Sequence, residues 1–286
     1  MEWIEKLNDA VRYIEENLSG EIDMEKAAEK ACCSLYHFQR MFSYVSGIPL
    51  SEYIRRRKMS LAALDLINGE KIIDISLKYG YTSPTAFNRA FKSIHGIAPS
   101  VARENGAALK SFPPISFKIT IKGAEEMNFK IENKGSFRIM GKTVPLDKNM
   151  ENNFMEIPKF WNRSACDGTV EKLCQIMGDD IKGILGVSVC PKEGGWKYFI
   201  ASVPKDNDKI MDGFEEYMVP SHTWAVFSGS GQCPKAIQDM EKRIFTEWLP
   251  SSGYEYDEGP DIELYFSPDP ANAVFEVWIP VKKLCK

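Results

Sequence analysis

Apolar residues recur every three or four positions through the first hundred residues, which is the spacing of amphipathic helices. The first such stripe consists of Ile4, Leu7, Val11, Ile14 and Leu18. Gly20 ends this helix, and Asp23 offers an N-cap for a short helix that reaches Ala31. Ser34 offers the next N-cap. Two short helices separated by a three-residue turn have the dimensions of a helix-turn-helix unit.

The helix that begins at Ser34 has a core side and a polar side. Leu35, Phe38 and Phe42 satisfy the core side. The faces that do not pack then carry the polar residues Tyr36, His37, Gln39, Arg40 and Ser43. Glutamine can form a bidentate pair with adenine, and arginine with guanine. We therefore predict that Tyr36, His37, Gln39 and Arg40 contact DNA, and for His37 a hydrogen bond within the unit is the alternative.

The same arrangement returns 49 positions later, at Ser83. A longer helix over residues 49–68 separates the two units, and its length of roughly 30 Å is close to one turn of DNA. The second recognition helix has Pro84 in its first turn and a core stripe of Phe87, Phe91 and Ile94. The residues predicted to contact DNA here are Ser83, Thr85, Asn88, Arg89 and Lys92. One chain could thus enter two successive major grooves.

The run from Ser34 to Arg103 resembles the DNA-binding domain of the AraC/XylS family of bacterial regulators. The residues that carry the resemblance include Gly80, Tyr81, Phe87, Arg89, Phe91, Lys92 and Pro99. The resemblance implies that Tyr36, Gln39 and Arg40 lie at base-reading positions of the first unit, and Thr85, Asn88 and Arg89 at those of the second. Some relatives have polar side chains where this chain has Pro84 and Ala86, which implies that the second helix reads less sequence.

Charge leaves one question open in the first half. The chain has a net charge of −4, yet basic residues gather at Arg55, Arg56, Arg57 and Lys58. Such a cluster is typical of a nucleic-acid footprint and equally of a solvated helix face. Arg57, within the long helix, is either structural or a DNA contact.

The periodicity changes after residues 104–116, where Gly, Ser and a Pro-Pro pair mark a domain boundary. The alternation of apolar and polar residues then predicts a strand over 117–122, followed by two successive copies of a βαββ pattern. The first copy has a strand at 129–146, a helix at 156–177 and strands at 183–189 and 196–203. The second has a strand over 214–227, a helix at 234–249 and strands at 261–267 and 273–281. The prediction is an all-α domain (1–105) with two helix-turn-helix units, a linker (106–116) and an α+β domain of duplicated βαββ units (117–286).

Duplicated units of this kind usually pack side by side around a shared groove, which invites a ligand. Two acids interrupt strands that otherwise look buried, Glu263 in DIELYF and Glu276 in VFEVWIP. A buried carboxylate needs a partner or a function. The candidate aromatic lining comprises Phe160, Trp161, Trp196, Tyr198, Trp224, Tyr265 and Trp278. Alternation places Glu276 with Val274 and Trp278, and if that face is solvated Glu276 is an ordinary surface residue.

A second resemblance bears on these acids. The segments VPSHTWAVFSGSG, EWLPSSGYEYDEGPDIELYF and FEVWIPV are similar to the GyrI-like effector-binding domain, which follows an AraC-type domain in Rob-like regulators. The resemblance implies that Glu276 lies in a pocket between the repeats, beside aromatic rings. It also implies lipophilic cations as ligands, with multidrug binding as a role, because a carboxylate matches their charge and rings add cation–π contact.

The expected function is a ligand-responsive, DNA-binding regulator that is not an enzyme. Two alternatives remain open. The second domain could be a small-molecule hydrolase, with Glu276 as general base and Tyr198 or Tyr265 as its helper. It could instead dock a protein such as RNA polymerase or gyrase, without any ligand.

Cofactor and metal sites are not expected. The seven cysteines are scattered and form no CxxC pair, which argues against a zinc site or a disulfide framework. The acidic opening residues do not resemble a signal peptide, and no apolar run reaches 18 residues. We therefore expect a cytoplasmic protein whose partners are double-stranded DNA, a small effector and RNA polymerase, with no membrane.

Overall fold

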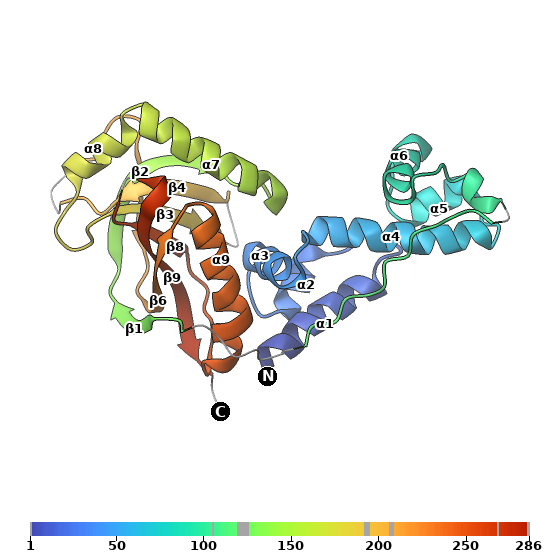
Figure 1. Ribbon diagram of the computed structural model, residues 1–286, viewed down its shortest axis with the longest axis horizontal. Helices are drawn as coiled ribbons and strands as arrows, with labels where there is room; N and C mark the ends of the chain where they lie inside the picture. The colour runs from blue at the N-terminus through green and yellow to red at the C-terminus, as the bar shows by residue number, and fades with distance from the viewer. Residues whose placement is uncertain are drawn as a thin grey trace. The chain divides into compact units, whose positions relative to one another are not determined.

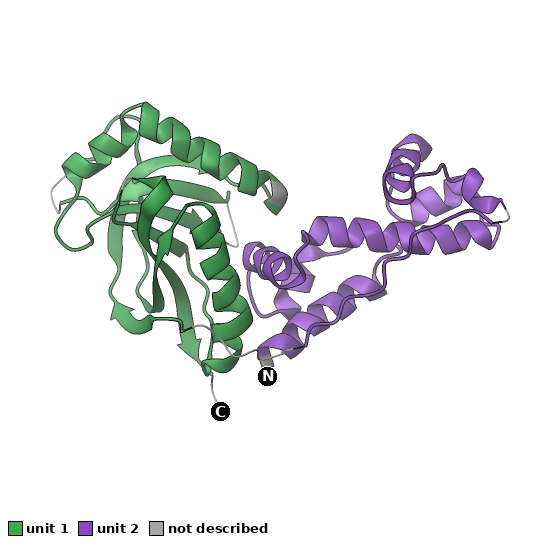
Figure 2. Cartoon of the chain, in the orientation of Figure 1, with its two compact units in different colours: residues 1, 119–286 green, residues 2–118 purple. Residues whose placement is uncertain are grey.

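Two compact units make up the chain, residues 2–118 and residues 119–286 (Figure 2). We call them the helical unit and the sheet unit. The computed structural model describes residues 2–104, 106–118, 126–191, 195–205, 209–267 and 269–284. Within these residues no helix is long and apolar enough to cross a membrane. The same residues contain no group of three or more His, Cys, Asp or Glu side chains that could hold a metal ion.

The helical unit contains the two predicted helix-turn-helix units. Its helices are α1 (Glu2–Glu16), α2 (Met24–Lys30), α3 (Leu35–Ser46), α4 (Leu50–Ile67), α5 (Ile72–Lys78) and α6 (Pro84–His95), followed by a single 3-10 turn at Val101–Arg103 (Figure 1). The predicted caps are in place, because the side chains of Asp23, Ser34 and Ser83 each accept a backbone N–H of the helix that follows. The helices α2 and α3 form the first unit, and α5 and α6 form the second.

The helix α4 joins the two units and takes part in the core of the second. Its residues Met59, Ala62 and Leu66 are buried in one apolar cluster with Phe87 and Phe91 of α6. Burial of this kind stabilises by roughly 1.5–3 kcal/mol per large side chain. The second recognition helix is therefore packed directly onto the connecting helix.

The sheet unit consists of one large antiparallel sheet with helices. Its strands are β1 (Phe129–Lys134), β2 (Phe137–Pro145), β3 (Ile184–Val189), β4 (Lys197–Ser202), β5 (Glu215–Val219), β6 (His222–Gly231), β7 (Tyr254–Tyr256), β8 (Asp261–Tyr265) and β9 (Ala273–Lys283). The order is β1-β6-β9-β8-β3-β4-β2-β5, with β7 paired to β9. Strands of the two predicted copies pair at three places, β1 with β6, β2 with β5 and, in the middle of the sheet, β3 with β8. We call the line where β3 pairs with β8 the seam.

The predicted helices of the two copies are shorter in the structure. The helix expected over 156–177 is two helices, α7 (Met150–Cys166) and α8 (Thr169–Ile176), because Gly168 adopts a left-handed conformation with φ of 77° between them. The helix expected over 234–249 is regular only in α9 (Lys235–Arg243), and a π-type turn at Ile244–Trp248 and a 3-10 turn at Leu249–Ser251 follow it. Of the strand predicted over 117–122, Phe117 and Lys118 are not in a strand, and the remainder lies outside the described residues.

Strand register decides which side chains share a face of the sheet. On one face, Glu263 of β8 lies opposite Gly186 of β3 and Val277 of β9. On the other face, Leu264 lies opposite Leu185 and Glu276, and this face carries a buried apolar cluster that includes Trp278. Glu263 and Glu276 therefore point to opposite sides of the sheet.

Candidate functional site

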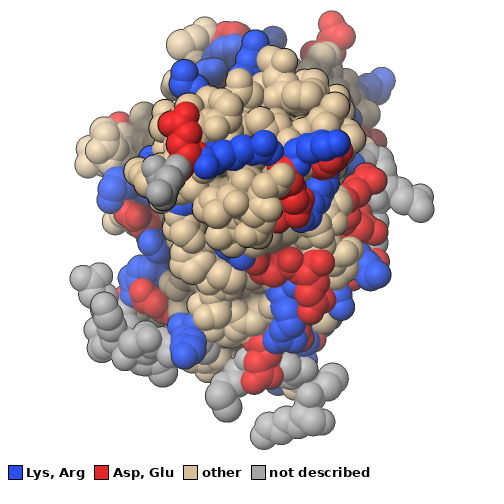
Figure 3. All heavy atoms as spheres, turned by 90° about the vertical axis from the view of Figure 1, so that its right-hand side faces the viewer, with Lys and Arg blue, Asp and Glu red and all other residues tan. Residues whose placement is uncertain are grey.

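The second recognition helix presents a polar face to solvent. In α6 the side chains of Phe87, Phe91 and Ile94 are buried. Its predicted DNA contacts Thr85, Asn88, Arg89 and Lys92 are exposed, and Ser83, which caps the helix, is half-buried. The core stripe and the predicted reading face are thus on different sides of this helix. Figure 3 shows the end of the molecule that carries α5 and α6, where basic, acidic and uncharged side chains are intermixed.

The first recognition helix differs from its sequence pattern. Tyr36, His37 and Arg40 were placed on faces that do not pack, whereas in the structure each is at most 5% exposed, and Gln39 is half-buried. The Arg40 guanidinium lies 5.9 Å and 5.8 Å from the ring centroids of Tyr36 and Tyr44. Sequence periodicity separates the two sides of a helix but does not specify which distant residues cover a polar side chain. Contact of these residues with DNA stays a prediction.

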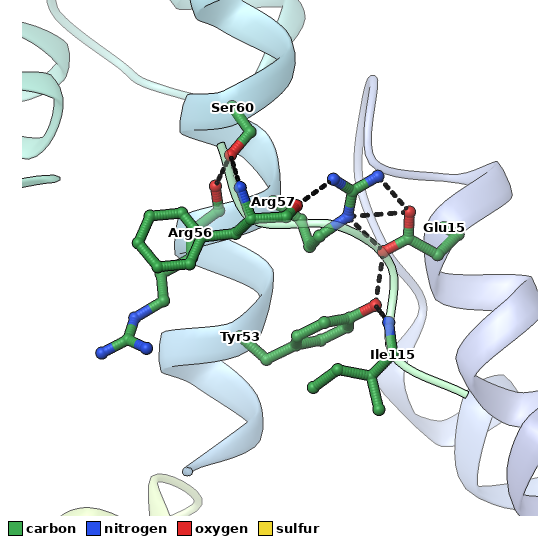
Figure 4. Close-up of polar contacts among 7 residues, drawn as sticks. Glu15, Tyr53, Arg56, Arg57, Ser60 and Ile115 are labelled. Carbon is green, nitrogen blue, oxygen red and sulfur yellow. Dashed lines mark hydrogen bonds and ion pairs between the residues drawn. The ribbon is translucent and has the colours of Figure 1, made fainter. Parts of the chain in front are cut away.

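The basic side chains of the cluster on α4 bind acidic side chains and backbone carbonyls inside the helical unit. Arg55 and Arg56 pair with Glu52, and Lys58 donates to the backbone carbonyls of Gly20 and Tyr79 at 3.3 and 3.1 Å. Burial lowers the pKa of Lys58. Arg57 is 8% exposed and binds Glu15 (Figure 4). The structural interpretation of Arg57 is the one that these contacts favour.

The exposure of Arg89 leads to a direct test. Replacement of Arg89 by alanine should weaken binding to a preferred duplex by about 1–3 kcal/mol more than binding to a scrambled duplex, because a bidentate contact to a base is lost. The control Lys92→Ala should weaken both to a similar extent, as expected for a phosphate contact. The measurement is fluorescence anisotropy at fixed salt, with a preferred duplex selected from a random pool. An equal loss on both duplexes for Arg89→Ala would assign Arg89 to the backbone.

Four predicted ligand residues come together at the seam of the sheet unit. The Glu263 carboxylate accepts hydrogen bonds from the hydroxyls of Tyr198 and Tyr265, each at 3.0 Å. The indole N–H of Trp161 on α7 donates to the Tyr198 hydroxyl at 2.9 Å. The rings of Trp161 and Tyr265 meet edge to face with centroids 4.9 Å apart. We call Trp161, Tyr198, Glu263 and Tyr265 the seam cluster.

Gly186 makes room for the seam cluster, and sequence reasoning missed it. A Cβ atom at Gly186 would lie 2.1 Å from the Tyr198 hydroxyl and 2.9 Å from the Glu263 carboxylate. The signal that could have indicated it is a glycine inside the mostly apolar strand ILGVSV, because an isolated glycine in a strand often marks a close approach.

The surroundings of the seam cluster favour neutral side chains. Burial, with the Glu263 charge nearby, raises the pKa of Tyr265 well above its ordinary value. The same two causes raise the pKa of the Cys233 thiol to about 11. Both groups therefore stay protonated near neutral pH.

The remaining predicted ligand residues lie elsewhere. Glu276 accepts the indole N–H of Trp278 at 2.8 Å and lies 3.5 Å from the Lys130 ammonium group. Trp224 and Trp278 are buried together in the cluster on the opposite face of the sheet from Glu263. Phe160 is buried, and Trp196 is half-buried beside β4. The hydrolase alternative paired Glu276 with Tyr198 or Tyr265, and the structure does not bring these residues together.

Comparison with known proteins agrees with both halves of this architecture. Residues 130–281 match the family model described as integron-associated effector binding protein, and residues 27–105 match a helix-turn-helix domain. Two helix-turn-helix units followed by a duplicated βαββ domain define a transcriptional regulator of the AraC class with a GyrI-like effector-binding domain. The chain belongs to the family of integron-associated effector binding proteins, which its sheet unit matches over more than half of the full length.

The relatives of the helical unit are regulators. The transcriptional activator AarP of Providencia stuartii is 37% identical over 98 residues, which cover 34% of this chain and 73% of AarP. The transcriptional regulator Rob of Salmonella typhimurium is 33% identical over 112 residues, 38% of this chain and 39% of Rob. Both relatives are described as regulators of transcription.

A solved structure covers the other half of the chain. A candidate bacterial transcription regulation protein from Staphylococcus aureus aligns with 55% of this chain and 99% of its own, with 24% identity and a TM-score of 0.47.

Proposed function

We propose that this DNA-binding regulator senses a small aromatic or cationic molecule at the seam cluster. The observation that carries the proposal is the Glu263 carboxylate, which two tyrosine hydroxyls orient beside the Trp161 ring. All three aromatic side chains come from different elements, namely α7, β4 and β8. An arrangement that converges from three elements on one charge has the geometry of a binding site.

The charge of Glu263 supports a cation as the ligand. A ligand cation would gain a Coulombic attraction to the half-buried carboxylate. The aromatic rings would add cation–π attraction of about 0.5–2 kcal/mol. A neutral aromatic molecule could use only the rings.

We assign the charge recognition to Glu263 and not to Glu276, which had been the stronger candidate by resemblance. The carboxylate of Glu276 already has an ammonium group and an indole N–H within reach. Glu263 accepts hydrogen bonds from two tyrosine hydroxyls, and it lies on β8 where that strand pairs with β3 of the first copy. Both positions are in the same sheet, so each is a natural control for the other.

We infer that the exposed polar face of α6 is a DNA-reading surface, and that the protein works in the cytoplasm, where bacterial DNA is found. Thr85, Asn88, Arg89 and Lys92 are side chains that can bond to bases and phosphates in a major groove. Contact with RNA polymerase stays a prediction.

The ligand assignment is tested by Glu263→Gln, which preserves size and one carbonyl oxygen while deleting the charge. Affinity for a cationic dye should fall about tenfold, and affinity for a neutral dye of matched shape should stay within about twofold, because only the cation loses a Coulombic partner. The measurement is fluorescence titration of the full chain with both dyes.

The matched control is Glu276→Gln, which should leave both affinities near those of the unmodified protein. If Glu276→Gln and not Glu263→Gln weakens the cationic dye, the site lies on the opposite face of the sheet. If neither substitution matters, neither carboxylate recognises a cation.

A further inference from the structure

The segment that follows the second helix-turn-helix unit is bound along the whole helical unit. We call residues 106–118 the strap, which appears in Figure 1 as the green trace that runs past α4 and α1. It forms no regular secondary structure, yet side chains of the helices satisfy four of its backbone N–H groups. The pairs are Lys110 with His95 Nδ1 (3.1 Å), Phe112 with Ser60 Oγ (2.9 Å), Ile115 with the Tyr53 hydroxyl (3.1 Å) and Phe117 with Asn8 Oδ1 (2.8 Å).

These partners belong to elements on both sides of α4. His95 is the last residue of the second recognition helix, and its Nε2 also bonds to the carbonyl of Met59 in α4 at 3.1 Å. Burial lowers the pKa of His95, which favours the neutral ring that can accept the Lys110 N–H. Asn8 lies on α1 and returns a second hydrogen bond to the Phe117 carbonyl at 3.0 Å. The strap therefore links α6, α4 and α1.

Apolar side chains fasten the strap at two places. Leu109 and Phe112 pack against the core cluster of the second helix-turn-helix unit. Phe117 is 7% exposed and meets the ring of Phe42, on the first recognition helix, with centroids 5.7 Å apart. Leu109 and Phe112 thus attach the strap to the core of the second helix-turn-helix unit, and Phe117 attaches its other end to the first.

A buried ion pair holds the middle of the strap. Arg57 of α4 donates to both oxygens of Glu15 on α1 and also to the carbonyl of Phe112 (Figure 4). The Tyr53 hydroxyl donates to the same Glu15 carboxylate at 2.6 Å and accepts the Ile115 N–H. One carboxylate therefore connects α1, α4 and the strap.

The sequence of the strap makes its span stiff. Pro113 and Pro114 are exposed and stand between the two fastened ends. Proline fixes φ near −65° and has no N–H, so this pair needs no hydrogen-bond acceptor and resists compression or bending. The distance between the fastened ends is thereby set by the chain itself.

We propose that the strap is a positioning element for DNA recognition that sets the spacing and angle between the two recognition helices. This inference rests on the proposed DNA-reading function of α6 and on the prediction that α3 also contacts DNA. Two readers on one chain gain affinity when their connection holds them at the spacing of their two half-sites. The strap is attached to both helix-turn-helix units and so adds a second connection beside α4. This connection narrows the range of half-site spacings on DNA that the chain can bind.

The test measures tolerance to half-site spacing with the full chain. The probe is the best duplex that the unmodified protein selects from a random pool, together with versions that carry one inserted or deleted base pair between the half-sites. One base pair changes the separation by about 3.4 Å and the rotation by about 34°. The unmodified protein should lose about tenfold in affinity on the altered duplexes.

Two variants loosen the strap in different ways. Pro113→Gly with Pro114→Gly alters only exposed residues, and Ser60→Ala removes the hydroxyl that accepts the Phe112 N–H. Each should bind the parent duplex about threefold to tenfold more weakly and lose no more than about threefold on the altered duplexes. Ser76→Ala is the matched control, because its buried hydroxyl bonds only within α5 among the described contacts. It should keep the steep dependence of the unmodified protein.

The outcomes separate positioning from stability. If both loosened variants bind more weakly by the same factor at every spacing, the strap only stabilises the fold and the proposal is wrong. It is also wrong if the unmodified protein tolerates the altered spacings or reads a single half-site. A protein that selects no duplex at all would instead contradict the proposed DNA-binding function.

Discussion

Replacement of Arg57 by methionine should destabilise the helical unit by about 3–5 kcal/mol, because it leaves the partly buried Glu15 carboxylate without its cation. The side chains of Arg57 and Glu15 are 9% and 17% exposed. The pKa of Arg57 is raised above its usual value, and the largest cause is its hydrogen bond to Glu15. The Phe112 carbonyl would lose a donor as well. This loss is large relative to the total stability of most domains.

The measurement is urea unfolding of the full chain, followed by circular dichroism at a helical wavelength. Arg55→Met is the matched control, because Arg55 lies on the same helix with its side chain 51% exposed and pairs with Glu52 at the surface. Exposed pairs contribute about 0–1 kcal/mol, so this control should unfold nearly as the unmodified protein does. Equal effects of the two substitutions would show that Arg57 has no special structural role.

Replacement of Gly186 by alanine should reduce dye affinity at the seam cluster at least about tenfold and destabilise the sheet unit by about 1–3 kcal/mol. The new methyl group would overlap the Tyr198 hydroxyl and the Glu263 carboxylate. Tyr198 is 1% exposed and has little space in which to move, so the hydrogen bonds of the cluster should break. Affinity should fall for cationic and neutral dyes alike, unlike the effect of Glu263→Gln.

Dye titration and thermal unfolding of the same protein check both parts of this expectation. Gly135→Ala is the control, since a Cβ atom at Gly135 meets nothing within 4 Å. Unchanged dye binding in Gly186→Ala would place the ligand away from the seam cluster. If Gly186→Ala lowers the stability but leaves dye affinity unchanged, the ligand likewise binds away from the seam cluster.

The fold of the helical unit could be predicted from local chemistry. Stripes such as Phe87, Phe91 and Ile94 repeat at the helical period, and Ser34 and Ser83 cap their helices as their side chains predict. Each signal is contained within a few residues, so it survives without knowledge of distant contacts. The exposed polar face of α6 follows from the same stripe. Alternation indicated the two copies, but each has two strands before its helix where the pattern predicted one, β1 and β2 in the first copy and β5 and β6 in the second.

Other features depend on contacts between residues far apart in the chain. Alternation correctly placed Glu276 on the face of Trp278, but only the pairing of β8 with β3 and β9 put Glu263 and Glu276 on opposite sides of the sheet. A shift of one residue in that register would exchange the two faces, and no local pattern specifies it. For the same reason, the convergence of Trp161, Tyr198 and Tyr265 on Glu263, and the attachment of the strap to Asn8 and Ser60, required the tertiary structure.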